Sequence, residues 1–237
     1  VLFRSLNQSW LFDALGVVIV LIAAYFSGYL FSNLQQVPLF RLHAWARYIP
    51  FGMISVISSS FSILSTRLTA RLNKFGNILG TFNTVLSGII DFLLGNNGAI
   101  LTYPVSFIIN AAAVRGWHYY GDNQVNRAKD FKKWLPLIIL MAILLSVTLN
   151  YLAFQNIGPL FWLASAVFSL SLIPNLLNVF KIEDQWIFWI VYNFAQLAKA
   201  VTQGNFANVG KYLYYIVNSA VAYPIWRAKR RFVKKTI

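Results

Sequence analysis

The sequence predicts an all-α polytopic membrane protein with about eight transmembrane helices. Hydrophobic residues make up 58% of the 237 residues and charged residues only 11%, and the mean hydropathy is +0.61. An ordinary soluble domain is far less apolar. Apolar stretches long enough to cross a bilayer recur along the chain. They lack the period-two alternation that is typical of transmembrane β-strands.

Each predicted span is a separate apolar stretch. The eight stretches are 10–31, 49–66, 75–95, 100–120, 135–154, 158–180, 184–203 and 207–226. The stretch 49–66 is the weakest, because it is rich in serine. The stretch 10–31 is too long for a signal peptide, and no small-residue cleavage site follows it.

The net charge of +14 predicts the orientation of the chain in the membrane. When the segments between spans are assigned alternately to two faces, 16 of the 20 Lys and Arg residues fall on one face. By the positive-inside rule, both termini are expected in the cytoplasm. The basic tail after Trp226 is expected to meet anionic lipid headgroups, and no nucleic-acid partner is expected.

Two segments of the chain repeat a pattern of aromatic and amide residues. The segments 82–117 and 192–226 each contain an aromatic-Asn pair, a Gly-Asn turn, an Ile-x-Asn or Ile-Val-Asn step and a closing Trp. From Asn83 to Asn110 is 27 residues, and from Asn193 to Asn218 is 25 residues. We therefore expect two three-helix bundles joined by one span, a 3+1+3 parallel repeat. Such repeats build transporters whose substrate site lies between the units.

This plan predicts five regions. They are an N-terminal accessory span and loop (1–45), a first three-helix bundle (46–120), a basic loop and linker span (121–157), a second three-helix bundle (158–227) and a basic cytoplasmic tail (228–237).

The stretch 186–196 combines an apolar face with a polar, aromatic stripe. At about 100° of rotation per residue, the stripe holds five candidate substrate-binding residues: Trp186, Trp189, Tyr192, Asn193 and Gln196. Polar groups inside membrane helices are costly and usually face a cavity or the protein interior. We interpret the stripe as a ligand-binding wall, in which the rings stack and the amides donate and accept hydrogen bonds.

Three further asparagines complete the predicted site. Asn83 lies on a similar stripe in the 75–95 helix, and Asn110 and Asn218 lie on the third helix of each unit. Asparagine also joins membrane helices to one another, so a packing role and a ligand role remain open for each residue. Trp186 lies near a span end, where an interfacial role is the alternative.

The sequence resembles the PnuC family of bacterial nicotinamide riboside transporters in its 3+1+3 plan, in the pattern WxxWxxYNxxQ at 186–196 and in the basic tail after Trp226. The resemblance covers roughly residues 49–232, and the family is similar in fold to the SWEET sugar transporters. It implies facilitated diffusion of a vitamin precursor across the inner membrane. It also implies a direction set by phosphorylation of the nucleoside for NAD synthesis, and a homotrimer. Relatives carry thiamine or riboflavin, so the vitamin stays open.

The residues are compatible with nicotinamide riboside or a similar cationic vitamin, because a tryptophan face attracts a cation by about 0.5–2 kcal/mol.

An enzyme is not expected: the sequence has no cysteine, and His43 and His118 lie near span ends. We therefore expect no cofactor, no metal and no catalytic residue. No GxxxxGK[ST] loop is present, and Asp91 and Asp13 are the candidates for ion coupling. A non-transporting membrane sensor or assembly protein is the alternative class.

Overall fold

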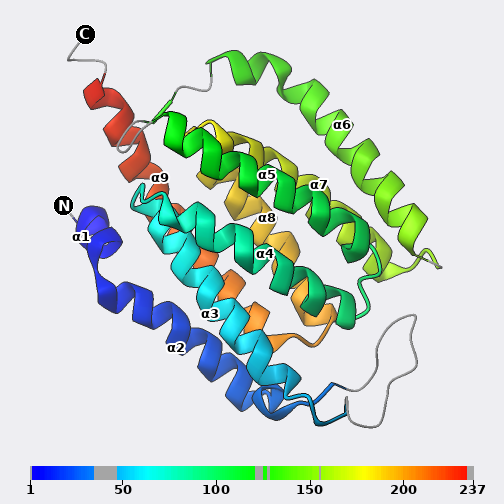
Figure 1. Ribbon diagram of the computed structural model, residues 1–237. Helices are drawn as coiled ribbons and strands as arrows, with labels where there is room; N and C mark the ends of the chain where they lie inside the picture. The colour runs from blue at the N-terminus through cyan, green and yellow to red at the C-terminus, as the bar shows by residue number, and fades with distance from the viewer. Residues whose placement is uncertain (1, 35–46, 121–124, 127–128, 155, 234–237) are drawn as a thin grey trace.

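The fold is all-helical apart from one isolated β-bridge between Asn126 and Ile182, within the residues that the computed structural model describes. Those residues are 2–34, 47–120, 125–126, 129–154 and 156–233 (Figure 1). The helices are α1 (Leu2–Gln8), α2 (Trp10–Phe26), the 3₁₀ turn η1 (Tyr29–Phe31), α3 (Phe51–Ala70), α4 (Phe75–Leu93), α5 (Ala99–Tyr119), α6 (Lys129–Ala153), α7 (Pro159–Val179), α8 (Gln185–Thr202) and α9 (Phe206–Val233). His43 and the Lys234–Lys235 end of the basic tail lie outside the described residues.

Each of the eight predicted spans coincides with one helix, from α2 to α9. Within the described chain, four helices are long and apolar enough to cross a membrane by composition, namely α3, α5, α6 and α7, and α2 is a shorter apolar helix. The prediction of a helical membrane protein is confirmed. The number of eight spans stays a prediction, because α4, α8 and α9 carry polar residues that lower their hydropathy.

Several helix bounds differ from the predicted ones. The first span ends at Phe26 and not at residue 31, because Gly28 has a φ of 73° and ends the helix. The linker helix begins at Lys129, and α9 continues to Val233, so that part of the predicted tail is helical. A helix can continue with polar residues beyond the hydrocarbon core of the bilayer. Hydropathy marks only the apolar part of such a helix, so it does not locate the helix ends.

Four helices end in the same hydrogen-bonded turn. After α3, α4, α7 and α8, a residue with positive φ donates its N–H to the carbonyl three residues earlier, and the next N–H donates to the carbonyl five residues earlier. This is the Schellman motif. The residues are Leu72 (φ 64°), Gly95 (φ 90°), Lys181 (φ 52°) and Gly204 (φ 65°). The turns after α3 and α7 use a non-glycine residue, and the turns after α4 and α8 use glycine.

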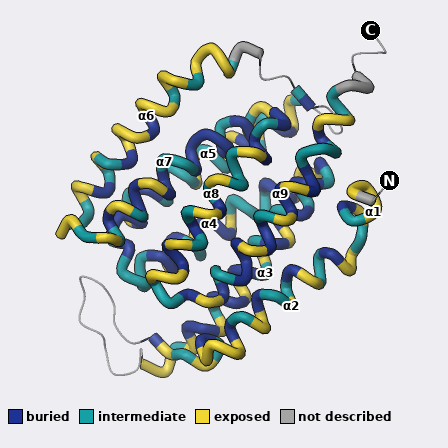
Figure 2. The backbone as a smooth tube through the Cα atoms, turned by 180° about the vertical axis from the view of Figure 1, so that it is seen from behind, coloured by how far each residue is buried: buried dark blue, intermediate teal, exposed yellow. Residues whose placement is uncertain are grey.

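The helices on the two sides of α6 pack in the same way. In sequence order α3 packs on α4 and α4 on α5, and likewise α7 on α8 and α8 on α9. The two groups meet along two seams, α5 against α7 and α3 against α9. Helix α6 lies on the outside of the bundle, with much of its surface exposed (Figure 2). This exposed surface is apolar, as a lipid-facing surface must be.

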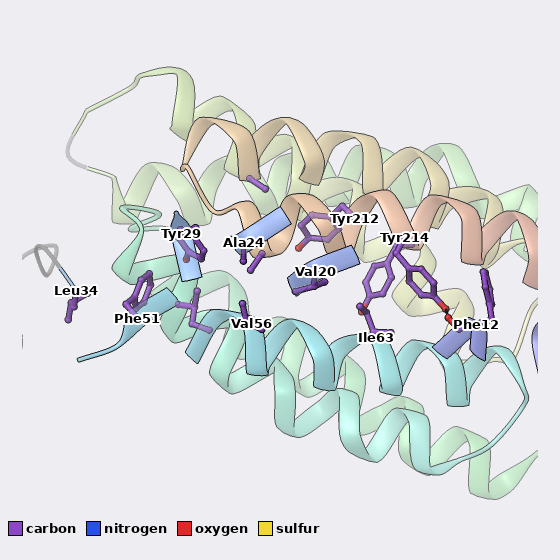
Figure 3. Packing of buried hydrophobic residues seen from close by; sticks show 14 of the residues in the cluster. Phe12, Val20, Ala24, Tyr29, Leu34, Phe51, Val56, Ile63, Tyr212 and Tyr214 are labelled. Carbon is purple, nitrogen blue, oxygen red and sulfur yellow. Dashed lines mark hydrogen bonds between the residues drawn. The ribbon is translucent and has the colours of Figure 1, made fainter. Parts of the chain in front are cut away.

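Helix α2 packs closely against α3 and α9 (Figure 3). The rings of Phe12 and Tyr214 lie 5.2 Å apart, and the Tyr214 hydroxyl donates to the Phe12 carbonyl at 2.9 Å. Gly210 permits this approach, because an added Cβ would lie 2.9 Å from the backbone oxygen of Ile19. Helix α2, expected to be accessory, is therefore part of the main core.

A partly buried ion cluster joins the same three helices. The Asp13 carboxylate on α2 accepts hydrogen bonds from Arg67 at 2.6 Å and from Arg71 at 2.6 Å. Arg67 is fully buried and also donates to Asn218 on α9 at 2.8 Å. Asp13, a candidate for ion coupling, is thus engaged in holding the bundle together. Both chain termini lie at this end of the bundle (Figure 1), which we call the termini end; the opposite end is the far end.

Candidate functional site

A polar cavity of about 200 Å³ lies inside the bundle, between α3, α4 and α5 on one side and α7, α8 and α9 on the other. Its wall is made largely of hydroxyl, amide and aromatic side chains, and it extends from the termini end to the far end. Two other hollows, one between α2 and α3 and one between α6 and α7, have almost entirely apolar walls. Among these spaces, the central cavity is the one suited to a polar ligand.

The structure brings seven of the eight predicted site residues to this cavity. The five residues of the α8 stripe line one wall, and Asn83 on α4 and Asn110 on α5 line the opposite wall. Trp186 is 1% exposed and packs on Trp226, with ring centroids 5.5 Å apart. An interfacial belt position is therefore excluded for Trp186.

Asn218 does not line the cavity. Its side-chain oxygen accepts the hydrogen bond from Arg67, and the residue is fully buried. These contacts indicate that Asn218 serves in helix packing. The repeat placed Asn110 and Asn218 at equivalent positions, but only Asn110 faces the cavity, where it donates to Thr84 at 2.8 Å.

Hydrogen bonds with neighbouring side chains orient the amides in the middle of the cavity. Asn83 accepts from Ser58 at 3.1 Å and donates to Ser87 at 3.2 Å. Gln196 donates to the Tyr192 hydroxyl at 2.5 Å. Side chains fixed in this way lose little rotamer freedom on binding, which favours selective recognition.

Several buried polar atoms in the cavity wall have no hydrogen-bond partner. They are Asn77 Nδ2, Asn96 Oδ1, Asn178 Oδ1, Asn193 Oδ1, Trp186 Nε1 and both side-chain polar atoms of Gln185. Each of these residues is less than a tenth exposed. Buried polar atoms are nearly always paired in folded proteins. A set of unpaired donors and acceptors around one cavity is the arrangement expected where a polar ligand supplies the missing partners.

Three tryptophans lie at the termini end of the cavity. Trp117 on α5 packs on Trp226 on α9 at 5.8 Å, and Trp226 packs on Trp186. The Trp117 indole donates to the Asn178 carbonyl on α7 at 2.7 Å, and the Trp226 indole donates to the Ala70 carbonyl on α3 at 2.9 Å. Each third helix is thereby hydrogen-bonded to the first helix of the opposite group at this end of the cavity.

Charged residues line the far end of the cavity. The Asp91 carboxylate pairs with Lys199 at 2.7 Å, and the Lys211 ammonium lies 4.5 Å from the Tyr212 ring centre. Asp91, Lys199 and Lys211 are each about 5% exposed or less. The cluster holds two cationic groups and one carboxylate, so it carries an excess of positive charge when both lysines are protonated.

Lys199 and Lys211 line the cavity but were not among the site residues predicted from the sequence. For Lys199 a signal was present, since it falls on the same helical stripe as Trp189 and Gln196. Asn77, Asn178 and Gln185 were also missed. They lie next to helix ends, where polar residues are usually solvated, and only the packing of the two groups buries them.

Taken together, an all-helical membrane bundle with a buried polar cavity between two similar groups of helices defines a membrane carrier of small polar molecules. Residues 52–228 match the family described as nicotinamide mononucleotide transporter. The chain belongs to this family, which confirms the family prediction.

A solved structure described as the vitamin B3 transporter PnuC has a similar fold. It matches with a TM-score of 0.67 at 12% sequence identity, and the match covers 98% of each chain. No curated protein matches this sequence.

Proposed function

We propose that this protein carries nicotinamide riboside across the bacterial cytoplasmic membrane by facilitated diffusion. The observation that carries the proposal is the central cavity, where the Trp189 and Trp186 rings stand beside amides with unpaired polar atoms. The pyridinium ring stacks on tryptophan, and the ribose hydroxyls and the carboxamide pair with Asn193, Gln196 and Asn83. A wall that needs hydrogen-bonding partners rejects analogues without them.

Electrostatics orient the ligand within the cavity. Trp186 and Lys199 are separated by 13 positions along α8, or about 20 Å at 1.5 Å per residue. At an effective dielectric constant of about 20, a cation beside Trp186 is repelled by the Lys199 ammonium by about 0.8 kcal/mol. Attraction to the ring is worth about 0.5–2 kcal/mol, and Asp91, which lies 2.7 Å from Lys199, offsets most of the repulsion. The charge that remains at the far end is that of Lys211 when it is protonated. We therefore place the pyridinium at the termini end, beside the tryptophans, and the ribose toward the far end.

The excess of positive charge at the far end supports nicotinamide mononucleotide as a second candidate substrate. Lys199 and Lys211 would stabilise a phosphate attached to the outward-pointing ribose, and the family description names this nucleotide. Lys211→Gln separates the two substrates. It should weaken binding of the mononucleotide and leave binding of the riboside unchanged.

The deciding experiment is a binding titration of the detergent-solubilised protein against nicotinamide riboside, nicotinamide mononucleotide, thiamine and riboflavin in parallel. We expect the riboside to bind most tightly. Tightest binding of thiamine or riboflavin would replace the proposed vitamin while keeping the transport function. Absence of binding by all four would favour a sensor or assembly protein.

Transport is proposed to be uncoupled, with direction set by phosphorylation of the arriving nucleoside in the cytoplasm for NAD synthesis. Asp91 is paired with Lys199, and Asp13 with Arg67 and Arg71, so each former coupling candidate is neutralised by a cation. Liposome uptake should be unchanged by a proton or sodium gradient and should stop at equal concentrations on both sides. Accumulation above the outside concentration would contradict this.

We further propose the 3+1+3 parallel repeat and a homotrimeric assembly. The repeat is supported by the matching turns after α3 and α7 and after α4 and α8, and by the two seams between the groups. We call α3, α4 and α5 unit one, and α7, α8 and α9 unit two. The trimer follows from the family resemblance, and the mass of the protein–detergent complex by light scattering tests it.

A further inference from the structure

The Asp91 carboxylate at the far end of the cavity is surrounded by donors. Its Oδ2 accepts from Lys199 Nζ at 2.7 Å and from Asn96 Nδ2 at 2.6 Å, and its Oδ1 accepts from Gln203 Nε2 at 2.7 Å. Asp91 is 5% exposed and Lys199 is 4% exposed. A buried carboxylate with this many donors is well satisfied, and the cluster has a single favoured arrangement.

These hydrogen bonds connect the two units. Asp91 and Asn96 belong to α4 and the turn that follows it in unit one, and Lys199 and Gln203 belong to α8 and its end in unit two. In the described chain α4 and α8 do not pack along their length, whereas α3 packs on α9 and α5 on α7. The cavity separates α4 from α8, and the ion pair crosses it at its far end.

Separation of this pair is costly as long as it stays dry. Removing the partner from a buried charge leaves an uncompensated ion, whose penalty is several kcal/mol. Water that enters the far end removes most of that penalty, because hydrated charges interact weakly. The pair therefore holds the far end closed until the two helix ends separate far enough for water to enter.

The termini end of the cavity is linked differently. There, Asn178 on α7 donates to Asn77 on α4 at 2.8 Å, and both groups are uncharged. The Trp117 and Trp226 indoles and the Arg67 guanidinium also donate hydrogen bonds from one unit to the other, each to an uncharged acceptor. Of the ion pairs Asp13–Arg67, Asp13–Arg71, Asp91–Lys199 and Glu183–Arg230, only Asp91–Lys199 joins the two units. The two ends of the path thus differ in the kind of polar contact that joins the units.

We propose that the Asp91–Lys199 pair, supported by Gln203 and Asn96, is the latch of the far-side gate. It is formed when the cavity is closed to the far side and broken when the cavity opens there. The latch rests on the proposed transport function, since only a carrier needs the far end to open and close.

The experiment measures access to the cavity and needs no substrate. The sequence contains no cysteine, so Ser106→Cys, which lies in the cavity wall, provides one reactive thiol. The rate of its labelling by a membrane-impermeant maleimide added outside intact cells reports opening of the far end. Because no ligand is present, this readout stays valid if the protein carries a different vitamin.

Asp91→Asn and Lys199→Gln, each in the Ser106→Cys background, should increase the labelling rate by about tenfold, which corresponds to about 1.4 kcal/mol. Gln203→Leu removes a single donor from a partly exposed position and should increase the rate by about two- to fivefold. It serves as the informative variant if the buried-charge variants fold poorly. The exchange Asp91→Lys with Lys199→Asp should return the rate to within about threefold of the parent.

The matched control is Glu183→Gln, which breaks another ion pair of a buried carboxylate, with the partly exposed Arg230, outside the cavity wall. Its labelling rate should equal that of the parent. Unchanged labelling in Asp91→Asn, Lys199→Gln and Gln203→Leu would overturn the latch. Faster labelling that the charge exchange fails to reverse, or that Glu183→Gln reproduces, would overturn it as well, since the residues would then only stabilise the fold.

Discussion

At the residue scale, the α8 stripe combines aromatic rings, which can stack on a ligand, with amides, which can form hydrogen bonds to it. Trp189 is partly exposed in the cavity wall and packs edge-on against Tyr192, with centroids 5.0 Å apart. Trp186 is also a core residue, because it is buried between the cavity and Trp226. Loss of Trp186 would damage both binding and packing, so Trp189 gives the cleaner measurement.

Trp189→Ala should weaken binding of the transported vitamin by about 1–3 kcal/mol, or about five- to more than a hundredfold, because it removes a stacking surface. Trp189→Phe should retain part of the affinity, since Phe keeps a smaller and weaker face. The measurement is a binding titration with each variant. Val191→Ala, which changes a residue that is 49% exposed on the opposite face, should bind like the parent. Equal damage from Val191→Ala would contradict a binding stripe.

Asn218 illustrates how an amide that looks like part of a ligand site is used for packing. Asn218→Ala removes one acceptor from the fully buried Arg67 guanidinium. We expect the free energy of unfolding to fall by about 1–3 kcal/mol while the binding constant stays within about twofold. Thermal unfolding and titration of the same sample test both halves. A large loss of affinity in a normally stable variant would return Asn218 to the site.

At the element scale, α2 is the helix whose role in the structure differs most from its predicted role as an accessory span. Its sequence looks like a simple apolar span outside the repeat. In the structure its Asp13 pairs with the buried Arg67 and the partly exposed Arg71, and the helix packs against α9 at Gly210. The Asp13 carboxylate neutralises arginine charge inside the bundle, where lipid headgroups cannot reach. Helix α2 therefore contributes to holding α3 and α9 together.

Gly210→Ala tests this packing. The added Cβ would lie 2.9 Å from the Ile19 oxygen and 3.0 Å from the Val20 Cα, both backbone atoms that cannot rotate away. We expect overpacking to lower the free energy of unfolding by about 1–3 kcal/mol. Gly158→Ala, where an added Cβ meets nothing within 4 Å, is the control and should unfold like the parent. Equal stability of the two variants would contradict close docking of α2 on α9.

At the scale of the whole molecule, both termini lie at one end of the bundle (Figure 1), together with α1 and the basic end of α9. The positive-inside rule assigns this end to the cytoplasm. The orientation determines which gate the Asp91–Lys199 pair closes, so it must be measured independently of the labelling experiment.

Epitope tags added before Val1 and after Ile237 should both be protected from protease added to intact cells, and both should be cleaved after the membrane is opened. The reason is that 16 of the 20 basic residues are assigned to the face that holds the termini. A periplasmic reporter fused within the loop before α3 is the control and should be cleaved in cells with a permeabilised outer membrane. Cleavage of either terminal tag before membrane lysis would reverse the orientation.

The sequence by itself determined the class of the protein, the positions of its helices and seven residues that line the cavity. These properties follow from hydropathy and helical periodicity, which are local and can be read from one segment at a time. Tertiary structure alone decided that Asn218 accepts a hydrogen bond from Arg67, that Asp13 joins α2 to the core, and that Lys211, Asn77 and Gln185 belong to the cavity. A polar residue near a helix end has the same local sequence whether it faces water, lipid or a partner. Its role depends on which distant helix packs against it, because only that packing removes water and makes an unpaired charge or amide costly.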